Sequence, residues 1–514
     1  MKKLATLVAV FALALALAPI AVFAQAQQDT VEQSGIQIQN LSTETANVSI
    51  RFVPGQGATG SEVTQNITVP GSGSRTLISF GAAGDPNTFL APAGFNGSVV
   101  VEADQPILAL ANLTNSNFSI TEGYPGFRQG ANRVLVPLVL RNNPVAGGNA
   151  STAITVQNTG TTPLNGTVTY VPGAAGSAGQ TDTFTGLTAG QSITFKQSSK
   201  TSLGDLFVGS ATVEANGPVA VAVTQEGASQ LTSYAGFTGG APTIALPLVV
   251  SGNTNNNNFT GLQVQNAGTE ATDVTFSFTN NQATAANFGR EPCGTNGVMT
   301  NRTVSVAPGA SFTLLTFGAT AGDVPGPGQG LDGQFFNCLY VGGATVTSSN
   351  AQPLVAIVNQ ASLAGTRSVS AYEGFTSTEA TNDTRAPLIS AGNFGFLTGV
   401  QVQNTAASGT TNFTITYSPN TATSNACGGA GGAMEARTFP LAAGAAVTLL
   451  QLGIGGTFDP ASPAFDPQFT SCTYVGSASV TGATGSTVVA IINQSNIGAF
   501  ATVDNLTTYN GFNQ

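Results

Sequence analysis

The chain has 514 residues and a formal net charge of −10, and only 7% of it is charged, whereas an average soluble domain has about 25%. The hydrophobic fraction of 41% excludes a disordered chain, and the 14 scattered Lys and Arg exclude a basic surface for nucleic acid. His is absent, which removes the commonest general base and metal ligand, so we expect neither a metal site nor a cofactor.

The N-terminus has the pattern of an export signal. Two lysines precede an apolar run from Leu4 to Phe23, and small residues at Ala24 and Ala26 fit the cleavage rule. About 20 apolar residues could also span a bilayer, but Pro19 and the small residues favour cleavage. We therefore expect residues 1–26 to be a signal peptide. The mature protein would be secreted, extracellular or on the cell surface, with no membrane span after cleavage.

Four copies of one unit fill the rest of the chain. The string apolar-x-apolar-Gln-Asn ends at Asn40, Asn158, Asn266 and Asn404, and a Tyr-x-Gly-Phe motif follows each copy. The third and fourth copies are longer because of an inserted loop. The predicted domains are 27–127, 128–238, 239–375 and 376–514.

Within each unit the apolar period is two. Stretches such as Ile154-Thr-Val156 and Thr167-Val-Thr-Tyr170 alternate β-branched and polar residues, as half-buried strands do. Clusters of Asn, Gly, Pro, Ser and Thr separate these stretches, which is typical of a β-sandwich. The linkers between units are short, as between Phe127 and Val134, and this predicts a semi-rigid rod.

The order of motifs carries a family resemblance. An apolar-Pro-Leu run precedes Val-Gln-Asn-x-Gly (Val156 to Gly160 in the second unit), and then come Val-Thr-Tyr, Gly-Ser-Ala-x-Val, Ala-Val/Ile-x-Asn-Gln and Tyr-x-Gly-Phe. This order resembles tandem immunoglobulin-like β-sandwich modules of bacterial secreted and cell-surface proteins, over nearly all of the predicted mature chain. The resemblance implies an all-β fold of four such domains forming an elongated rod. Such modules serve as spacers, stalks and assembly subunits, and the family supplies no catalytic residues.

The first unit departs from this order. Nothing like the Leu-Pro-Leu opening strand of the other units, for example Val134 to Leu138, precedes Ile36. We favour a shortened strand or a locally covered edge. The alternative is an open edge that accepts a strand from a neighbouring molecule. No donor tail is evident after Phe512, which weakens that alternative.

Four cysteines fit an oxidising compartment. Four cysteines allow three pairings, and the repeated separation of 45 residues favours Cys293 with Cys338 and Cys427 with Cys472. Each disulfide would contribute about 3–4 kcal/mol in the chain-entropy model. A zinc site is the alternative, but no two cysteines are closely spaced and no His could complete one.

Other candidate sites have structural explanations. All eight Tyr lie at repeat-equivalent positions, which favours core packing over carbohydrate stacking, and the Asn of each Gln-Asn pair is expected to start a turn. Asp459 and Asp466 are the remaining carboxylate pair for glycosidase chemistry, but both precede Pro in one loop that the other units lack, and we interpret them as turns. Lys196 and Lys200 are the only bases available to a Ser nucleophile, and neither lies in Ser-x-x-Lys. We therefore expect that the protein is not an enzyme.

Fourteen Asn-x-Ser/Thr sequons mark positions where glycans would add solubility. The candidate glycosylation positions are Asn47, Asn66, Asn96, Asn112, Asn165, Asn258, Asn301, Asn412 and Asn505.

These observations predict a non-enzymatic extracellular structural protein, a subunit of a surface layer, sheath, filament or adhesive stalk. Its partners would be further copies of itself or a cell-surface glycan or protein. The alternative is an array of carbohydrate- or protein-binding modules on the cell surface.

Overall fold

The structure is a computed structural model of the whole chain. It describes residues 20–22, 33–71, 73–80, 85–92, 94–115, 120–145, 148–227, 230–253, 258–280, 290–295, 297–316, 330–362, 368–393, 395–419, 427–428, 434–453, 465–496 and 506–513. The predicted all-β class is confirmed, because these residues form strands, turns and four short 3-10 helices, with no α-helix among them.

The strands fall into four groups that follow the sequence repeats. The first group is β1 (Ile20–Val22), β2 (Gln33–Asn40), β3 (Ala46–Pro54), β4 (Val63–Val69), β5 (Ser74–Ile78), β6 (Gly97–Ala103), β7 (Ile107–Thr114) and β8 (Thr121–Pro125). The second is β9 (Ala131–Arg141), β10 (Asn143–Val145), β11 (Gly148–Asn158), β12 (Leu164–Ala175), β13 (Gln180–Leu187), β14 (Ser192–Lys196), β15 (Phe207–Gly227) and β16 (Gln230–Ala235). The third is β17 (Thr243–Ser251), β18 (Phe259–Asn266), β19 (Thr272–Asn280), β20 (Arg302–Val306), β21 (Ser311–Leu315), β22 (Gly330–Leu331), β23 (Tyr340–Ser348), β24 (Leu354–Ala361), β25 (Val369–Glu373) and β26 (Phe375–Thr376). The fourth is β27 (Asp383–Ala391), β28 (Phe396–Asn404), β29 (Thr410–Pro419), β30 (Arg437–Ala442), β31 (Ala446–Gln451), β32 (Tyr474–Gly482), β33 (Val488–Asn496), β34 (Thr507–Asn510) and β35 (Phe512–Asn513).

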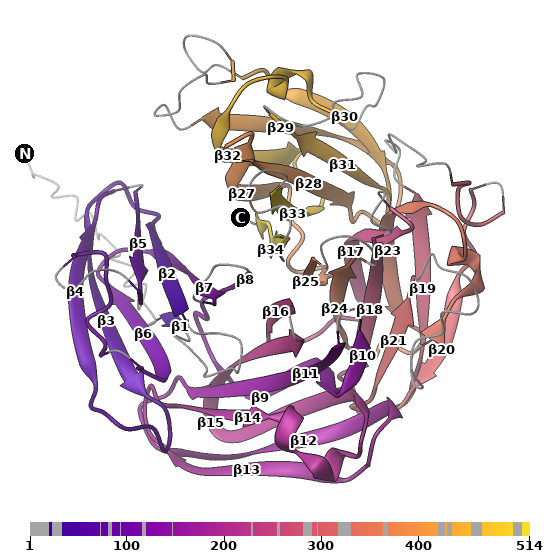
Figure 1. Cartoon of the computed structure of the whole chain (residues 1–514). Helices are drawn as coiled ribbons and strands as arrows, with labels where there is room; N and C mark the ends of the chain where they lie inside the picture. Colours follow the sequence, from indigo (N-terminus) through magenta and orange to yellow (C-terminus); the bar gives the residue numbers. More distant parts are fainter. Residues whose placement is uncertain are drawn as a thin grey trace, which may run out of the picture.

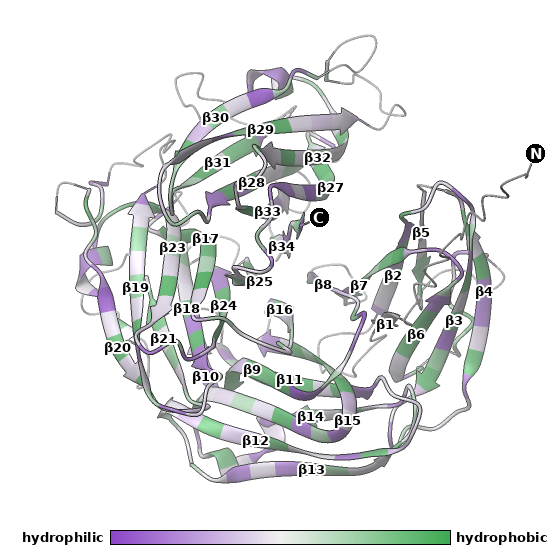
Figure 2. Cartoon of the chain, turned by 180° about the vertical axis from the view of Figure 1, so that it is seen from behind, coloured by the Kyte–Doolittle hydropathy of each residue, from purple (hydrophilic) through white to green (hydrophobic). Residues whose placement is uncertain are grey.

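Each group forms two sheets around a shared core. The outer sheet contains the opening strand, as in β1-β6-β3-β4 and β26-β17-β23-β19-β20. The inner sheet contains the Gln-Asn strand, as in β5-β2-β7-β8 and β31-β28-β33-β34. In the second group the 21-residue strand β15 runs through both layers and joins them. Hydrophobic and polar residues alternate along the strands in Figure 2. The period of two therefore places one face of each strand in a core.

The Asn of each Gln-Asn pair holds a turn. Asn158 Nδ2 donates to the carbonyl oxygens of Thr162 and Leu187, at 2.8 Å each. Its Oδ1 accepts from the backbone N–H of Gly160 at 2.8 Å, which is an Asx turn. Asn40 and Asn266 make all three bonds, and Asn404 donates to the Leu441 carbonyl and accepts from the N–H of Ala406. The predicted turn-starting role of these Asn is confirmed.

The Pro-Leu pair of β9, β17 and β27 forms a β-bulge, and a Tyr hydroxyl makes hydrogen bonds with the backbone of that bulge. Pro137 and Leu138 lie opposite one residue of β15, between the pairs Val136–Ala211 and Val139–Gly209. Tyr234 Oη donates to the Leu138 carbonyl at 2.6 Å and accepts from its N–H at 3.3 Å. Tyr372 with Leu248 and Tyr509 with Leu388 repeat this arrangement. The Tyr of Tyr-x-Gly-Phe therefore satisfies backbone groups that the bulge removes from the ladder.

The four sandwiches follow a curve, so the predicted elongated rod is wrong (Figure 1). The short strands β8, β16, β25 and β34 lie near the centre of the curve and contact one another in order, and β34 also contacts β8. The physical reason is that the inner sheet of each later sandwich packs against the preceding one, so the direction changes at every junction. Short linkers restrict the distance between neighbours but do not fix that direction.

In the first sandwich a three-residue opening strand precedes Ile36, which matches the favoured expectation of a shortened strand. Strand β1 lies within the predicted signal peptide and pairs antiparallel with β6, with Ile20 opposite Val101 and Val22 opposite Val99. This strand lacks the Leu-Pro-Leu motif, because pairing at a sheet edge uses backbone groups and requires no particular motif.

Candidate functional site

Buried Gln side chains join consecutive sandwiches. Gln265, near the end of β18, donates from Nε2 to the Gly309 carbonyl of its own sandwich at 3.0 Å and to the Ala211 carbonyl of the preceding one at 3.3 Å. Gln403 makes the matching pair of bonds, and Gln157 makes the bond within its own sandwich. All three side chains are fully buried. The repeated Gln therefore serves the domain junctions, a role that the sequence did not reveal.

Apolar side chains complete the junctions. They point away from their own sandwich and lie in the core cluster of the preceding one, so each junction excludes water. Ala220, Ala222 and Leu231 pack with the first core, Ile357 and Ala371 with the second, and Val489 and Ile491 with the third.

Reciprocal amide pairs lie on the inner side of two junctions. Gln225 and Asn359 exchange hydrogen bonds of 3.1 and 2.8 Å, and Gln360 and Asn493 exchange bonds of 3.1 and 2.9 Å. In each pair the Gln comes from the earlier sandwich and the Asn from the later one. At the first junction, the residues at the same repeat positions as this Gln and Asn are Leu113 and Thr224. These two side chains cannot exchange a pair of amide hydrogen bonds.

A carboxylate also bonds across the junction between the second and third sandwiches. Glu373, at the end of β25, accepts from the backbone N–H of Ala235 in the second sandwich at 2.9 Å. Burial raises the pKa of Glu373 above its usual range, and the Ala235 hydrogen bond opposes that shift in part.

The first sandwich exposes the positions that the junctions bury. Gln39, Leu108 and Leu110 are half-buried. Their equivalents in the second sandwich, Gln157, Ala220 and Ala222, are at most 4% exposed. The difference arises because, among the described residues, no other sandwich packs on this face of the first one.

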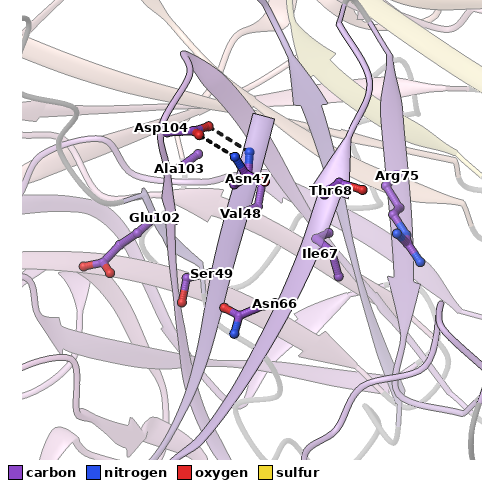
Figure 3. Close-up of a pocket in the computed structure, with 10 residues that line it drawn as sticks. All are labelled: Asn47, Val48, Ser49, Asn66, Ile67, Thr68, Arg75, Glu102, Ala103 and Asp104. Atoms are coloured by element: carbon purple, nitrogen blue, oxygen red, sulfur yellow. Dashed lines mark hydrogen bonds between the residues drawn. The ribbon is translucent and has the colours of Figure 1, made fainter. Parts of the chain in front are cut away.

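An open groove with a volume of about 690 Å³ lies on the outer sheet of the first sandwich (Figure 3). Asn47 donates to Asp104 from its backbone N–H at 2.8 Å and from Nδ2 at 2.7 Å, and these bonds lower the pKa of the Asp104 carboxyl. The remaining lining residues are Val48, Ser49, Asn66, Ile67, Thr68, Arg75, Glu102 and Ala103. None of the described residues that line the groove is aromatic, so none of them offers a ring on which a sugar could stack.

The cysteines are paired as their spacing predicts. Cys293 is bonded to Cys338 and Cys427 to Cys472, with Cα–Cα distances of 4.9 and 5.0 Å. Both disulfides join an inserted loop to the turn before the Gly-led strand. The first and second sandwiches contain no Cys.

The Asp-Pro loop is structural where it is described. Asp466 is 1% exposed and caps a 3-10 helix, Pro467–Phe469, by accepting from the N–H of Gln468. Asp332 in the third sandwich caps Gly333–Phe335 in the same way. This corrects the expectation that the other units hold nothing comparable. Asp459 lies outside the described residues.

The other predicted positions also have structural roles. Lys200 Nζ forms an ion pair with Asp182 at 2.6 Å, and Tyr170 donates to the same carboxylate at 2.7 Å. Seven of the eight Tyr are at most 5% exposed, and Tyr509 is partly buried, so none of them forms an exposed stacking platform. Among the sequons, Asn505 is not described; Asn47, Asn66, Asn165, Asn301 and Asn412 are exposed, and Asn96, Asn112 and Asn258 are half-buried.

Within the described part of the chain, no group of three or more Cys, Asp and Glu side chains could hold a metal ion. No helix in that part is long and apolar enough to cross a membrane. Comparison with protein-family models, with curated proteins and with solved structures gives no match.

Proposed function

We propose that the protein is a non-enzymatic extracellular structural protein of four tandem immunoglobulin-like β-sandwiches. It would act as a subunit of a surface layer, sheath, filament or adhesive stalk. One observation carries the proposal: the same Gln and apolar positions recur at the three junctions, where they are buried. Buried apolar junctions favour a fixed arrangement of domains over loose tethering.

Two further features support the proposed location. The N-terminal apolar run fits an export signal, and two disulfides fit an oxidising compartment. The low charge would allow close lateral packing between copies because little charge must be desolvated.

Negative-stain microscopy of the exported protein tests this function. We expect curved four-domain particles that assemble into filaments or sheets as the concentration rises. Particles that stay dispersed at every concentration would contradict the proposal.

The groove of the first sandwich favours a second candidate, an array of carbohydrate- or protein-binding modules. Its polar lining of amides, hydroxyls and carboxylates could bind sugar hydroxyls. Saturable binding of a polysaccharide by monomers, lost in Asn66→Ala and retained in Asn165→Ala on the second sandwich, would support this candidate over assembly.

A further inference from the structure

We propose that cleavage of the signal peptide removes the opening strand of the first sandwich, and that the vacated edge of β6 binds an extended apolar strand of another polypeptide. The inference rests on the proposed function, since it names a contact by which such a subunit would join its neighbour.

The register shows that β1 occupies the place of an opening strand. Val99 lies two residues after Gly97, the first residue of β6, and is paired with Val22. Val101 lies two residues further along β6 and is paired with Ile20. The second sandwich pairs Ala211 with Val136 and Val213 with Val134 at the same two positions of β15. The third and fourth sandwiches repeat these pairings, with Ala344 opposite Leu246, Val346 opposite Ile244, Ala478 opposite Ala386 and Val480 opposite Thr384.

The predicted cleavage points follow this strand directly. Ala24 lies two residues after the end of β1, and Ala26 lies four residues after it. Cleavage at either point removes all three residues that pair with β6. In either case the segment Gln27-Gln-Asp-Thr-Val-Glu32 precedes β2, and its two acids and three polar residues are unsuited to a buried strand.

An opening strand contributes backbone bonds and core packing. In the second sandwich Val134 and Val136 are fully buried. In the first sandwich Val99 and Val101 of β6 are fully buried as well. Loss of the strand leaves β6 as an edge with unpaired N–H and C=O groups beside an apolar core, which is a template for strand addition.

Tyr124 adds a requirement for the incoming strand. It is 2% exposed and occupies the position of Tyr234, whose hydroxyl binds the N–H and C=O of Leu138 in the bulge. The partner that fits is therefore an antiparallel segment with apolar residues at alternate positions, followed by a bulge. The chain's own segment Arg133–Arg141 has this composition and serves as a probe.

The test uses the exported protein and a labelled synthetic peptide with the sequence of Arg133–Arg141. Mass spectrometry first locates the N-terminus, which we expect after Ala24 or Ala26. Fluorescence anisotropy then measures peptide binding, and we expect saturation together with a rise of several °C in the thermal midpoint of the protein. A peptide with Asp in place of Val134 and Val136 should not bind.

The matched variants are Tyr124→Phe and Tyr234→Phe. Tyr124→Phe should weaken peptide binding about two- to tenfold, because one hydrogen bond to the bulge is lost. Tyr234→Phe should leave binding unchanged, since its sandwich keeps a covalently attached opening strand. An N-terminus before Ile20, no binding, or equal binding of the Asp peptide would overturn the inference. Filaments or sheets that form without peptide binding would overturn this inference alone, and peptide binding by a protein that never assembles would overturn the proposed function alone.

Discussion

The first and second sandwiches share one plan and differ in their surroundings. In the second, the inner sheet lies against the first sandwich, and the opening strand is the continuous strand β9. In the first, the same sheet positions are half-buried, and the opening strand lies in the predicted signal peptide. The comparison shows that positions equivalent in sequence need not be equally buried, because burial depends on the neighbouring domain.

The largest expected effect comes from an apolar junction residue. Ile357→Ala removes a fully buried side chain from the junction with the second sandwich and should destabilise the protein by about 2–5 kcal/mol. Leu110→Ala changes the equivalent position of the first sandwich, which is half-buried, and should cost less than about 1 kcal/mol. Urea unfolding of both variants measures the difference. Equal losses would show that the first inner sheet is covered in solution.

A smaller effect is expected from the repeated Gln. Gln265→Ala removes the bonds to Gly309 and Ala211 and should cost about 1–2 kcal/mol. Gln39→Ala, at the same position of the half-buried first face, should change stability by less than about 0.5 kcal/mol. Thermal unfolding and protease resistance of the junction would check this pair. If the junction in Gln265→Ala resists protease as well as the junction in the parent protein does, Gln265 does not have the role assigned to it.

The smallest effect concerns pH. Because burial raises the pKa of folded Glu373 above its unfolded value, the protonated form favours folding. Its contribution to stability is full below the unfolded pKa, near 4.5, and is lost as the pH rises through the folded pKa. Glu373→Gln should therefore be more stable than the parent at neutral pH and equal to it in acid. Unfolding free energies of both proteins, measured from acidic to neutral pH, test the direction of this effect. A variant that is less stable than the parent at neutral pH would contradict it.

Local chemistry made part of the fold predictable. The period of two predicted the strands, and the chemistry of Asn at a strand end predicted the turns that Asn158 and its equivalents form. The 45-residue spacing predicted both disulfides. Each of these features depends on residues within one repeat.

Features that depend on two sandwiches were not predictable in this way. Gln265 and Gln403 donate to carbonyls of the preceding sandwich, and nothing local in the sequence shows these partners. The same holds for Ala220 and Ile357, which resemble ordinary strand residues.

The sequence by itself determined the all-β class, the four repeats and the cysteine pairs, because these follow from composition and local spacing. Only the tertiary structure decided the curvature, the burial of the junctions and the placement of β1 on β6. The physical reason is that packing between domains depends on how surfaces from distant parts of the chain meet, and strand pairing at an edge uses backbone groups that every sequence carries.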